Sequence, residues 1–193
     1  MFDFVASLLG LIILSPLFLI IAIAIKAEDP KGSVFYSQTR LGRGETPFKM
    51  YKFRSMVSNA DQLLEELLKN NEIDGAMFKM QDDPRVTKIG KFIRKYSIDE
   101  LPQLLNVLQG SMSLVGPRPP LPREVEEYSD YDKQRLAVKP GCTGLWQATV
   151  RNSVGFDDMV KLDLTYISKR SVAFDVYILF KTVVIMFKPN GAY

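Results

Sequence analysis

The longest uncharged run in the chain constrains its fold more than any other feature. Residues Phe4–Ile25 are 22 consecutive residues without a charge. As a helix, this run would be about 33 Å long, which is enough to cross the hydrocarbon core of a membrane. The run is too long for a signal peptide, and its flanks carry neither a basic segment nor a small-residue cleavage pattern. The length also argues against a helix buried in a soluble core. We therefore expect a membrane helix over residues 1–26.

Ser15 and Pro16 lie at the centre of this run. Proline inside a helix removes a backbone hydrogen bond and kinks the helix. A kinked helix can enter the membrane and return to the same side, with Ser15 bonding the freed carbonyl groups. Hydropathy alone is compatible with a full crossing and with a re-entrant hairpin, so both readings stay open.

The composition excludes several kinds of chemistry. The chain has no histidine, which rules out Ser–His and Cys–His catalysis and a histidine proton shuttle. Cys142 is the only cysteine, so neither a disulfide framework nor a zinc cluster is expected. Any metal would have oxygen ligands, which favours Mg²⁺ or Mn²⁺. The formal net charge of +3 is too small to indicate nucleic acid, although basic residues after the apolar run suit phosphates or anionic lipid headgroups.

Two adjacent carboxylates, Asp99 and Glu100, open a predicted helix that Gly110 ends. Ser97 and Glu100 have the spacing of a capping box, and Asp99 is an alternative N-cap. Pro102 fits near the first turn in both readings. Either places both carboxylates at the positive end of a helix, where backbone N–H groups can hold an anion. Two carboxylates beside a phosphate need a cation between them, so the stretch predicts a Mg²⁺ site with Asp99 and Glu100 as ligands.

The remaining pattern predicts an α+β fold that is mostly α, with a small helical domain over residues 27–193 after the membrane helix. Strands over 34–38 and 48–53, joined by a glycine-containing loop, predict a β-hairpin, and one short extra strand fits the pattern. Helices are predicted over 59–70, 83–96, 124–135, 157–168 and 174–187. The last is strongly apolar but too short to span a membrane comfortably, so it is a core helix or lies in the membrane interface.

The helix over 83–96 begins, on this pattern, with Asp83 as N-cap and Pro84 in the first turn. Spacing predicts an inward apolar face and an outward basic face. The inward residues are Val86, Ile89, Phe92, Ile93 and Tyr96, and the outward residues are Arg85, Lys88, Lys91, Arg94 and Lys95.

Five basic residues stand out along the chain. Arg94 lies in the last turn of its predicted helix, five residues before Asp99. Arg118 lies in a loop stiffened by three prolines and a glycine, which suits a side chain that must meet a ligand in one geometry. Lys52 and Arg54 flank an aromatic residue in the second strand, and Arg151 lies in a polar turn. Each of these residues, taken separately, could equally be an ordinary solvent-exposed residue or part of a plain turn without a ligand.

Taken together, the motifs resemble a known family. They are Ser15-Pro16, Tyr51-Lys52-Phe53-Arg54-Ser55-Met56, Arg94 with Ser97-Ile98-Asp99-Glu100-Leu101-Pro102-Gln103, Asn106-Val107-Leu108, Ser113-Leu114-Val115-Gly116-Pro117-Arg118-Pro119, Lys139-Pro140-Gly141-Cys142-Thr143-Gly144-Leu145-Trp146-Gln147 and Arg151-Asn152. Their order over nearly the whole chain resembles the monotopic bacterial phosphoglycosyl transferases, also called undecaprenyl-phosphate sugar phosphotransferases. Val150, where a glycine often precedes the arginine, and Cys142, at a usually aliphatic position, depart from the family pattern.

The resemblance implies an enzyme at the cytoplasmic face of the bacterial inner membrane. It would transfer a sugar 1-phosphate from a UDP-sugar to undecaprenyl phosphate, as the first step of exopolysaccharide, capsule or glycoconjugate assembly, and release UMP. The resemblance implies a re-entrant first helix with its break at Ser15 and Pro16. It implies Asp99 as the nucleophile and Glu100 as its partner in holding Mg²⁺. Phosphate contacts are assigned to four side chains: Arg94, Arg118, Arg151 and Lys52.

Two other functions fit the residues. A non-catalytic membrane-anchored module would bind anionic lipid through its basic face, with the carboxylates only capping a helix. A lipid-phosphate phosphatase would use the same aspartyl-phosphate chemistry. The sequence indicates neither which sugar is transferred, nor the oligomeric state, nor whether the chain is an excised catalytic domain.

Overall fold

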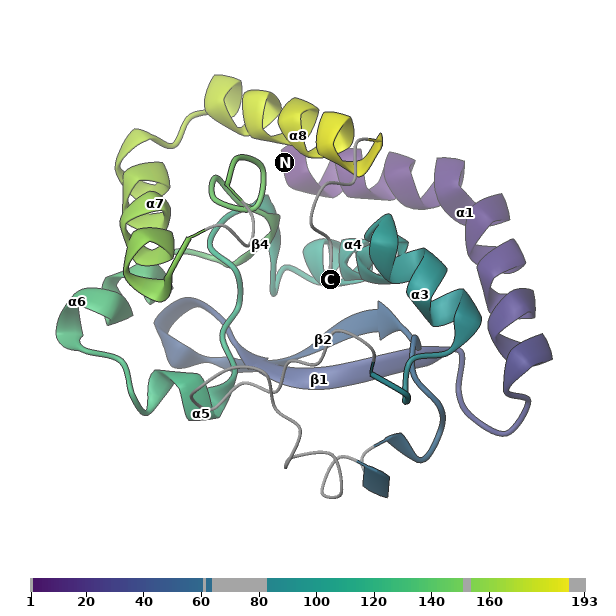
Figure 1. Ribbon diagram of the computed structural model, residues 1–193. Coiled ribbons are helices and arrows are strands. Elements are labelled where there is room, and N and C mark those ends of the chain that lie inside the picture. Colours follow the sequence, from purple (N-terminus) through teal and green to yellow (C-terminus); the bar gives the residue numbers. More distant parts are fainter. Residues whose placement is uncertain (1, 61, 64–82, 151–153, 188–193) are drawn as a thin grey trace.

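The structure is a computed structural model that describes residues 2–60, 62–63, 83–150 and 154–187. It is mostly helical, as expected (Figure 1), and has two small sheets, of which only the β-hairpin was predicted. Its elements are α1 (Phe2–Glu28), β1 (Phe35–Leu41), the 3₁₀ helix η1 (Arg43–Glu45), β2 (Pro47–Phe53), α3 (Lys88–Lys95), the 3₁₀ helix η3 (Ile98–Glu100), α4 (Gln103–Leu108), β3 (Ser113–Val115), α5 (Pro122–Val125), α6 (Asp130–Lys133), the 3₁₀ helix η4 (Gln134–Ala137), β4 (Gly141–Thr143), α7 (Phe156–Lys169) and α8 (Val172–Phe187). The helix predicted over 59–70 falls mainly outside the described residues.

The N-terminal helix α1 continues through Pro16 for 27 residues. Because proline has no N–H group, it leaves the carbonyl of Ile12, four residues earlier, without its helical donor. The Ser15 hydroxyl donates to that same carbonyl at 2.8 Å. Figure 1 shows α1 changing direction part-way along its length. The predicted bond from Ser15 is therefore confirmed, and the helix accommodates Pro16 without an interruption of its regular structure.

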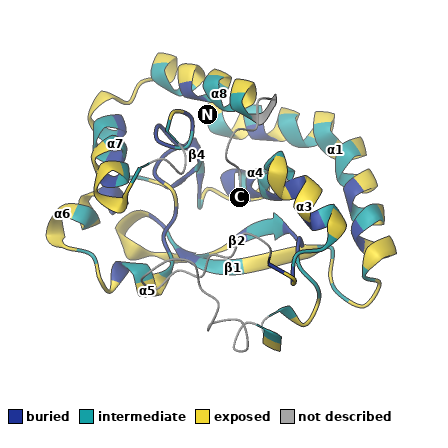
Figure 2. Ribbon diagram, in the orientation of Figure 1, coloured by how far each residue is buried: buried dark blue, intermediate teal, exposed yellow. Residues whose placement is uncertain are grey.

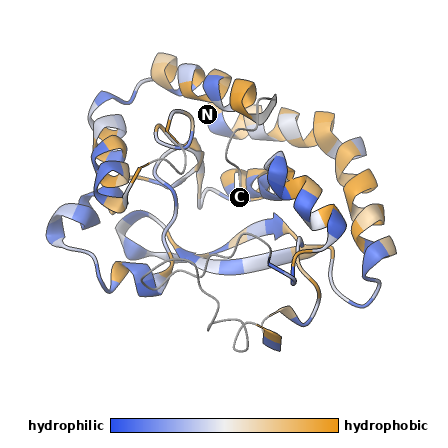
Figure 3. Cartoon of the chain, in the orientation of Figure 1, coloured by the Kyte–Doolittle hydropathy of each residue, from blue (hydrophilic) through white to orange (hydrophobic). Residues whose placement is uncertain are grey.

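Most of α1 is hydrophobic and yet exposed (Figures 2 and 3). Only Ser7, Ile21 and Ile25 are buried in this helix. The exposed apolar side chains include Phe4, Val5, Leu8, Leu9, Ile12, Ile13, Leu19, Ile20 and Ile23. By length and composition, α1 is able to span a membrane. An exposed apolar surface of this size is typical of a site of contact with a membrane or another protein.

Both ends of α1 are held by the same globular part of the chain. Near its start, Asp3 accepts a hydrogen bond of 2.6 Å from the hydroxyl of Ser113 in β3. At its end, the carboxylate of Glu28 accepts hydrogen bonds from the first two backbone N–H groups of α3, at 2.7 and 2.9 Å. Between these ends, α1 packs on α4 and α3. The helix is therefore attached to one body at both ends, without crossing away from it.

The predicted hairpin is confirmed, and its first strand is longer than expected. β1 pairs with β2 in antiparallel register from Phe35↔Phe53 to Leu41↔Pro47. The loop turns through Gly44 and Glu45, both with positive φ. Glycine adopts this backbone conformation without strain, which explains the glycine in the turn.

A second, two-stranded parallel sheet joins β3 to β4, with Ser113 opposite Gly141 and Val115 opposite Thr143. A Cβ atom at Gly141 would lie 2.0 Å from the backbone nitrogen of Gly116, so only glycine allows this close approach. The main core cluster gathers around this sheet. Its buried members are Met50, Val107, Met112, Leu114, Val115, Leu145, Ala148, Tyr166 and Ile178.

Two helix predictions are wrong. The helix predicted from Asp83 begins at Lys88, because the Thr87 hydroxyl caps it by accepting a hydrogen bond from the Gly90 N–H. Asp83 instead forms a buried ion pair with Arg85 at 2.6 Å. Arg85 is therefore buried rather than outward, and Phe92, predicted inward, is 49% exposed.

The helix predicted over 124–135 is divided into α5, α6 and η4. Ser129 begins a new helix through a capping box with Asp132, which stops the preceding one from continuing. The two C-terminal predictions are confirmed: α7 and α8 cover the expected ranges. In α8, Ile178 is fully buried, whereas Val176, Phe180 and Val183 are exposed.

Candidate active site

The two adjacent carboxylates, Asp99 and Glu100, lie in η3, the tight turn that connects α3 to α4. Both predicted caps are wrong. Ser97 has a left-handed backbone conformation with φ of 55° and its side chain caps nothing, and the residue at the N-cap position of α4 is Pro102 rather than Asp99. The Ser97 N–H donates to the carbonyl of Arg94 at the end of α3, and its carbonyl accepts from the Glu100 N–H. Ser97 therefore joins α3 to η3 and does not cap α4. α4 begins at Gln103, after Pro102. The carboxylates therefore precede α4 by one turn and are not in its first turn.

Lys52 of β2 meets this turn. Its ammonium group lies 2.6 Å from the Oε1 atom of Glu100. Asn106 of α4, which is 1% exposed, fixes the strand by accepting from the Tyr51 N–H at 3.0 Å and donating to the Lys49 carbonyl at 2.7 Å. One buried amide thus sets the position of Lys52 relative to the carboxylates.

Asp99 is buried, at 8% exposure. The pKa of Asp99 is raised to about 6. Burial is the main cause and the charge of Glu100 adds to it, whereas the charges of Lys52 and Arg94 act to lower this pKa. Burial also acts to raise the pKa of Glu100, but Lys52, Arg118 and Arg40 hold that pKa below its usual value. Within the described ranges, no side chain donates a hydrogen bond to the Asp99 carboxylate. Asp99 is therefore the less compensated of the two negative charges.

Arg118 lies in the proline-rich loop, which a second arginine supports. Arg40 of β1 is buried and donates to the carbonyl of Pro119 at 3.1 Å. The Leu41 N–H donates to the carbonyl of Pro120 at 3.0 Å. Burial and the nearby charge of Arg118 lower the pKa of Arg40 to about 10, so it stays cationic at neutral pH. In the part of the chain that the structure describes, no ion pair or hydrogen bond engages the Arg118 guanidinium, which leaves it available to an anion.

Arg94 approaches the carboxylate turn from α3. Its Nε atom donates to the Ser55 hydroxyl at 2.8 Å, and its charge lowers the pKa of Asp99. A Cβ atom at Gly90 would meet the Ser55 carbonyl oxygen at 1.9 Å, so glycine is required for α3 to pack this closely. Arg151, the remaining candidate, lies outside the described residues.

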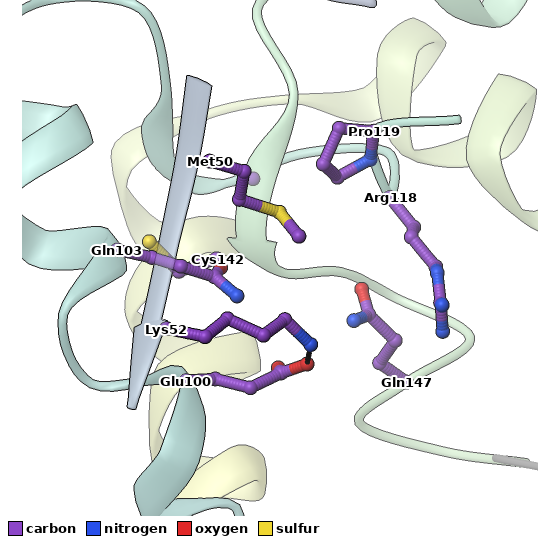
Figure 4. A pocket seen from close by; sticks show the side chains of 9 residues that line it. Met50, Lys52, Glu100, Gln103, Arg118, Pro119, Cys142 and Gln147 are labelled. Atoms are coloured by element: carbon purple, nitrogen blue, oxygen red, sulfur yellow. Dashed lines mark hydrogen bonds and ion pairs between the residues drawn. The ribbon is translucent and has the colours of Figure 1, made fainter. Parts of the chain in front are cut away.

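These elements surround a small pocket (Figure 4). Its lining residues are Met50, Lys52, Glu100, Gln103, Arg118, Pro119, Gly141, Cys142 and Gln147. Three predicted site residues, Lys52, Glu100 and Arg118, meet there, and Asp99 precedes Glu100 in the same turn. Sequence reasoning missed four others: Arg40, Gln103, Asn106 and Gln147. Gln103, Asn106 and Gln147 lie within recognised motifs, but uncharged amides carry no signal of their role without the fold.

The carboxylates at this site are oxygen ligands of the kind that Mg²⁺ prefers. No group of three or more His, Cys, Asp or Glu side chains that could hold a metal exists among the described residues. Mg²⁺ commonly uses only one or two carboxylates together with substrate phosphates and water. Asp99 and Glu100 are such a pair, and the raised pKa of Asp99 reflects its burial and the nearby charge of Glu100, which Lys52 and Arg94 only partly offset. The donor set therefore fits Mg²⁺ bound together with a phosphate substrate.

Comparison with known proteins places this site in context. The model of the bacterial sugar transferase family matches residues 1–189. The chain is 47% identical over 196 residues to the undecaprenyl-phosphate galactose phosphotransferase of Salmonella typhimurium, covering 100% of this chain and 41% of the relative. It is 43% identical over 196 residues to the exopolysaccharide production protein ExoY of Sinorhizobium fredii, covering 100% and 86%.

A third relative is the UDP-glucose:undecaprenyl-phosphate glucose-1-phosphate transferase of Escherichia coli, at 39% identity over 199 residues, covering 99% and 40%. The chain thus spans about two fifths of the length of the galactose and glucose phosphotransferases and most of the length of ExoY.

Proposed function

The chain belongs to the bacterial sugar transferase family, and we propose that it transfers a sugar 1-phosphate from a UDP-sugar to undecaprenyl phosphate, releasing UMP. The observation that carries the proposal is the buried Asp99 carboxylate, which is influenced by the charges of Lys52 and Arg94 and directly precedes Glu100 in the chain. Glu100 lines a pocket together with Lys52 and Arg118. The names of relatives support the substrates, since they specify undecaprenyl phosphate with galactose or UDP-glucose. A hexose donor and a role in exopolysaccharide or capsule assembly follow by analogy.

The first chemical step is attack by an Asp99 carboxylate oxygen on the sugar-bearing phosphorus of the UDP-sugar. A new P–O bond forms to Asp99, and the pyrophosphate P–O bond breaks, so that UMP leaves with the bonding electron pair. A phosphate oxygen of undecaprenyl phosphate then attacks the same phosphorus. The P–O bond to Asp99 breaks, which regenerates the carboxylate and gives undecaprenyl diphosphate-sugar. A carboxylate nucleophile needs no base to remove a proton at neutral pH, which suits a chain without histidine.

The surrounding charges supply electrostatic stabilisation. Arg118 is free of described partners and can meet the phosphate oxygens, with Arg94 and Lys52 on the side of the carboxylates. Glu100, ionised through its pair with Lys52, completes the acidic pair. Mg²⁺ held by Asp99 and Glu100 would supply further neutralisation of the transferred phosphoryl group. Arg151 remains a proposed phosphate contact.

We place the enzyme at the cytoplasmic face of the inner membrane, with α1 as a re-entrant helix. The support is that Asp3 and Glu28, near opposite ends of α1, both bind the globular part. A straight 27-residue helix would be about 40 Å long and would separate those ends across a bilayer. A bend at Pro16 allows both ends to remain on one side, and the Ser15 bond limits the cost of the proline in lipid.

The test is a scan of UDP-sugars with the purified chain, undecaprenyl phosphate and Mg²⁺, reading UMP release and the lipid product. At least one UDP-hexose should give both products in equal amounts. Asp99→Ala should abolish both while leaving the folded structure intact. The alternative, a non-catalytic module that binds anionic lipid, predicts no UMP from any donor, and a lipid-phosphate phosphatase would release inorganic phosphate without a diphosphate-linked lipid.

A further inference from the structure

Two glutamine side chains, Gln103 and Gln147, line the pocket. Gln103 of α4 is only 3% exposed, and among the described residues nothing forms a hydrogen bond with its side chain. Gln147, in the loop after β4, has a buried Oε1 atom with no hydrogen-bond partner. Figure 4 shows the two side chains reaching toward the same space from opposite sides, with Lys52 and Glu100 below them in this view.

Such groups are costly to leave unsatisfied. A buried polar atom without a hydrogen bond typically costs about 1–3 kcal/mol, so unpaired buried amides are rare in folded proteins. The Gln147 Oε1 atom is such a group, and the nearly buried Gln103 side chain lines the same pocket. This arrangement indicates that partners for these amides arrive with a ligand. A Cβ atom at Gly144 would lie 3.0 Å from the Gln147 Oε1 atom, so the loop closely surrounds this amide.

The chemistry of an amide limits what the ligand is. Each amide has an oxygen that accepts and an NH₂ group that donates. A sugar hydroxyl does both, whereas a phosphate at neutral pH mainly accepts. Phosphate binding is already served by Lys52 and Arg118, which lie on the same pocket. The amides therefore suit the uncharged, hydroxyl-rich part of a nucleotide sugar.

We infer that Gln147 and Gln103 form a subsite that binds hydroxyl groups of the transferred sugar. This inference rests on the proposed function, because that function places the attacked phosphorus at Asp99. The sugar is joined directly to that phosphorus, whereas the nucleoside is separated from it by a second phosphate. Gln103 follows Glu100 by three residues in the turn into α4. Side chains this close to the carboxylates meet the sugar rather than the uracil base.

The experiment combines Gln147→Met with deoxy analogues of the UDP-hexose that the wild-type chain uses. Methionine keeps a similar volume but removes the amide. Loss of one hydrogen bond to a substrate hydroxyl should lower kcat/KM roughly 10- to 100-fold. The kcat/KM of wild type should fall by a similar factor when the substrate is the analogue that lacks the contacted hydroxyl. The kcat/KM of Gln147→Met should be nearly the same with that analogue as with the normal substrate, because the variant already lacks the contact.

Gln134→Met is the matched control, since Gln134 is exposed in η4 away from the pocket. It should keep wild-type kcat/KM. Product inhibition by UMP shows whether Gln147 contacts the sugar or the nucleoside. If it contacts the sugar, Gln147→Met should leave the UMP inhibition constant unchanged. A weakened UMP inhibition, an unchanged kcat/KM, or losses that multiply with every deoxy analogue would each overturn the sugar subsite. If wild type used no UDP-sugar, the proposed function itself would fail, which is a distinct outcome.

Discussion

The ammonium group of Lys52 lies 2.6 Å from the Oε1 atom of Glu100, and this ion pair joins the β-hairpin to the carboxylate turn. The two residues are 48 positions apart, and Asn106 fixes the strand that carries Lys52. Lys52 acts to lower the pKa of both Asp99 and Glu100. It therefore has an electrostatic role besides any contact with a substrate phosphate.

Lys52→Met should shift the pH dependence of activity. Removing the ammonium charge raises the pKa of Asp99 above its present value of about 6. The acidic limb of a plot of kcat/KM against pH should then move to higher pH, and activity at neutral pH should fall. Lys49→Met, on the same strand with its ammonium group bonded to Thr39, is the control and should leave the limb in place. An unmoved limb in Lys52→Met would show that Lys52 does not tune the carboxylates.

Asp99→Asn should be inactive and yet more stable than wild type at pH 7. The folded-state pKa of Asp99 is raised from 3.8 to about 6, so the folded protein binds this proton more tightly than the unfolded chain does. The contribution of Asp99 to stability is thus greatest at acid pH and is lost as the pH rises from about 4 to 6. Asparagine does not ionise and so avoids that loss. The free energy of unfolding of Asp99→Asn at pH 7 should therefore exceed that of wild type by roughly 1–3 kcal/mol.

Urea unfolding of both proteins at pH 4 and pH 7 measures this difference. The gain should be present at pH 7 and nearly absent at pH 4. If wild type and Asp99→Asn had equal free energies of unfolding at pH 7 as well as at pH 4, the raised pKa of Asp99 would be contradicted.

Arg40→Met should weaken substrate binding by loosening the loop that carries Arg118. The guanidinium of Arg40 is buried and donates to the Pro119 carbonyl, so its removal leaves that carbonyl unpaired. We expect a loss of about 1–3 kcal/mol in the free energy of unfolding and an increase in KM for the UDP-sugar that exceeds the decrease in kcat. Arg43 is exposed in η1, so Arg43→Met should leave the free energy of unfolding, KM and kcat unchanged. Steady-state kinetics and thermal unfolding give both readings, and a purely structural Arg40 would leave KM unchanged.

A topology measurement tests the re-entrant helix. In a Cys142→Ala background, cysteines placed at Phe2 and at the exposed Lys31 should react with a membrane-impermeant maleimide from the same side of the membrane. Intact cells should protect both, and inverted membrane vesicles should expose both. Labelling of the two sites from opposite sides would establish a full crossing and contradict the placement proposed for α1.

The elements that local pattern predicts well are those with strong periodicity. The uncharged run became α1, and the hairpin, α7 and α8 also appear where expected. Errors arose where a local contact overrode the pattern. Asp83 was a plausible cap until Arg85 paired with it, and Ser129 started a new helix inside a continuous polar stretch.

The charged residues of the candidate site could be predicted from the sequence, because clusters of Lys, Arg, Asp and Glu are typical of sites that bind phosphate and metal ions. The amides were not. Asn106, Gln103 and Gln147 gain meaning only when the fold shows which backbone groups they bind or which pocket they face. The burial that raises the pKa of Asp99 is likewise a property of the folded chain.

The most direct test of the account is to look for the covalent intermediate. The purified chain is incubated with Mg²⁺ and the UDP-hexose it uses, without undecaprenyl phosphate, and is then examined by intact-protein and peptide mass spectrometry. We predict a mass increase of one hexosyl phosphate, located on the peptide at Asp99, lost on addition of undecaprenyl phosphate and absent from Asp99→Asn. An active enzyme that forms no adduct, or an Asp99→Asn protein that still acquires one, would contradict Asp99 as the nucleophile.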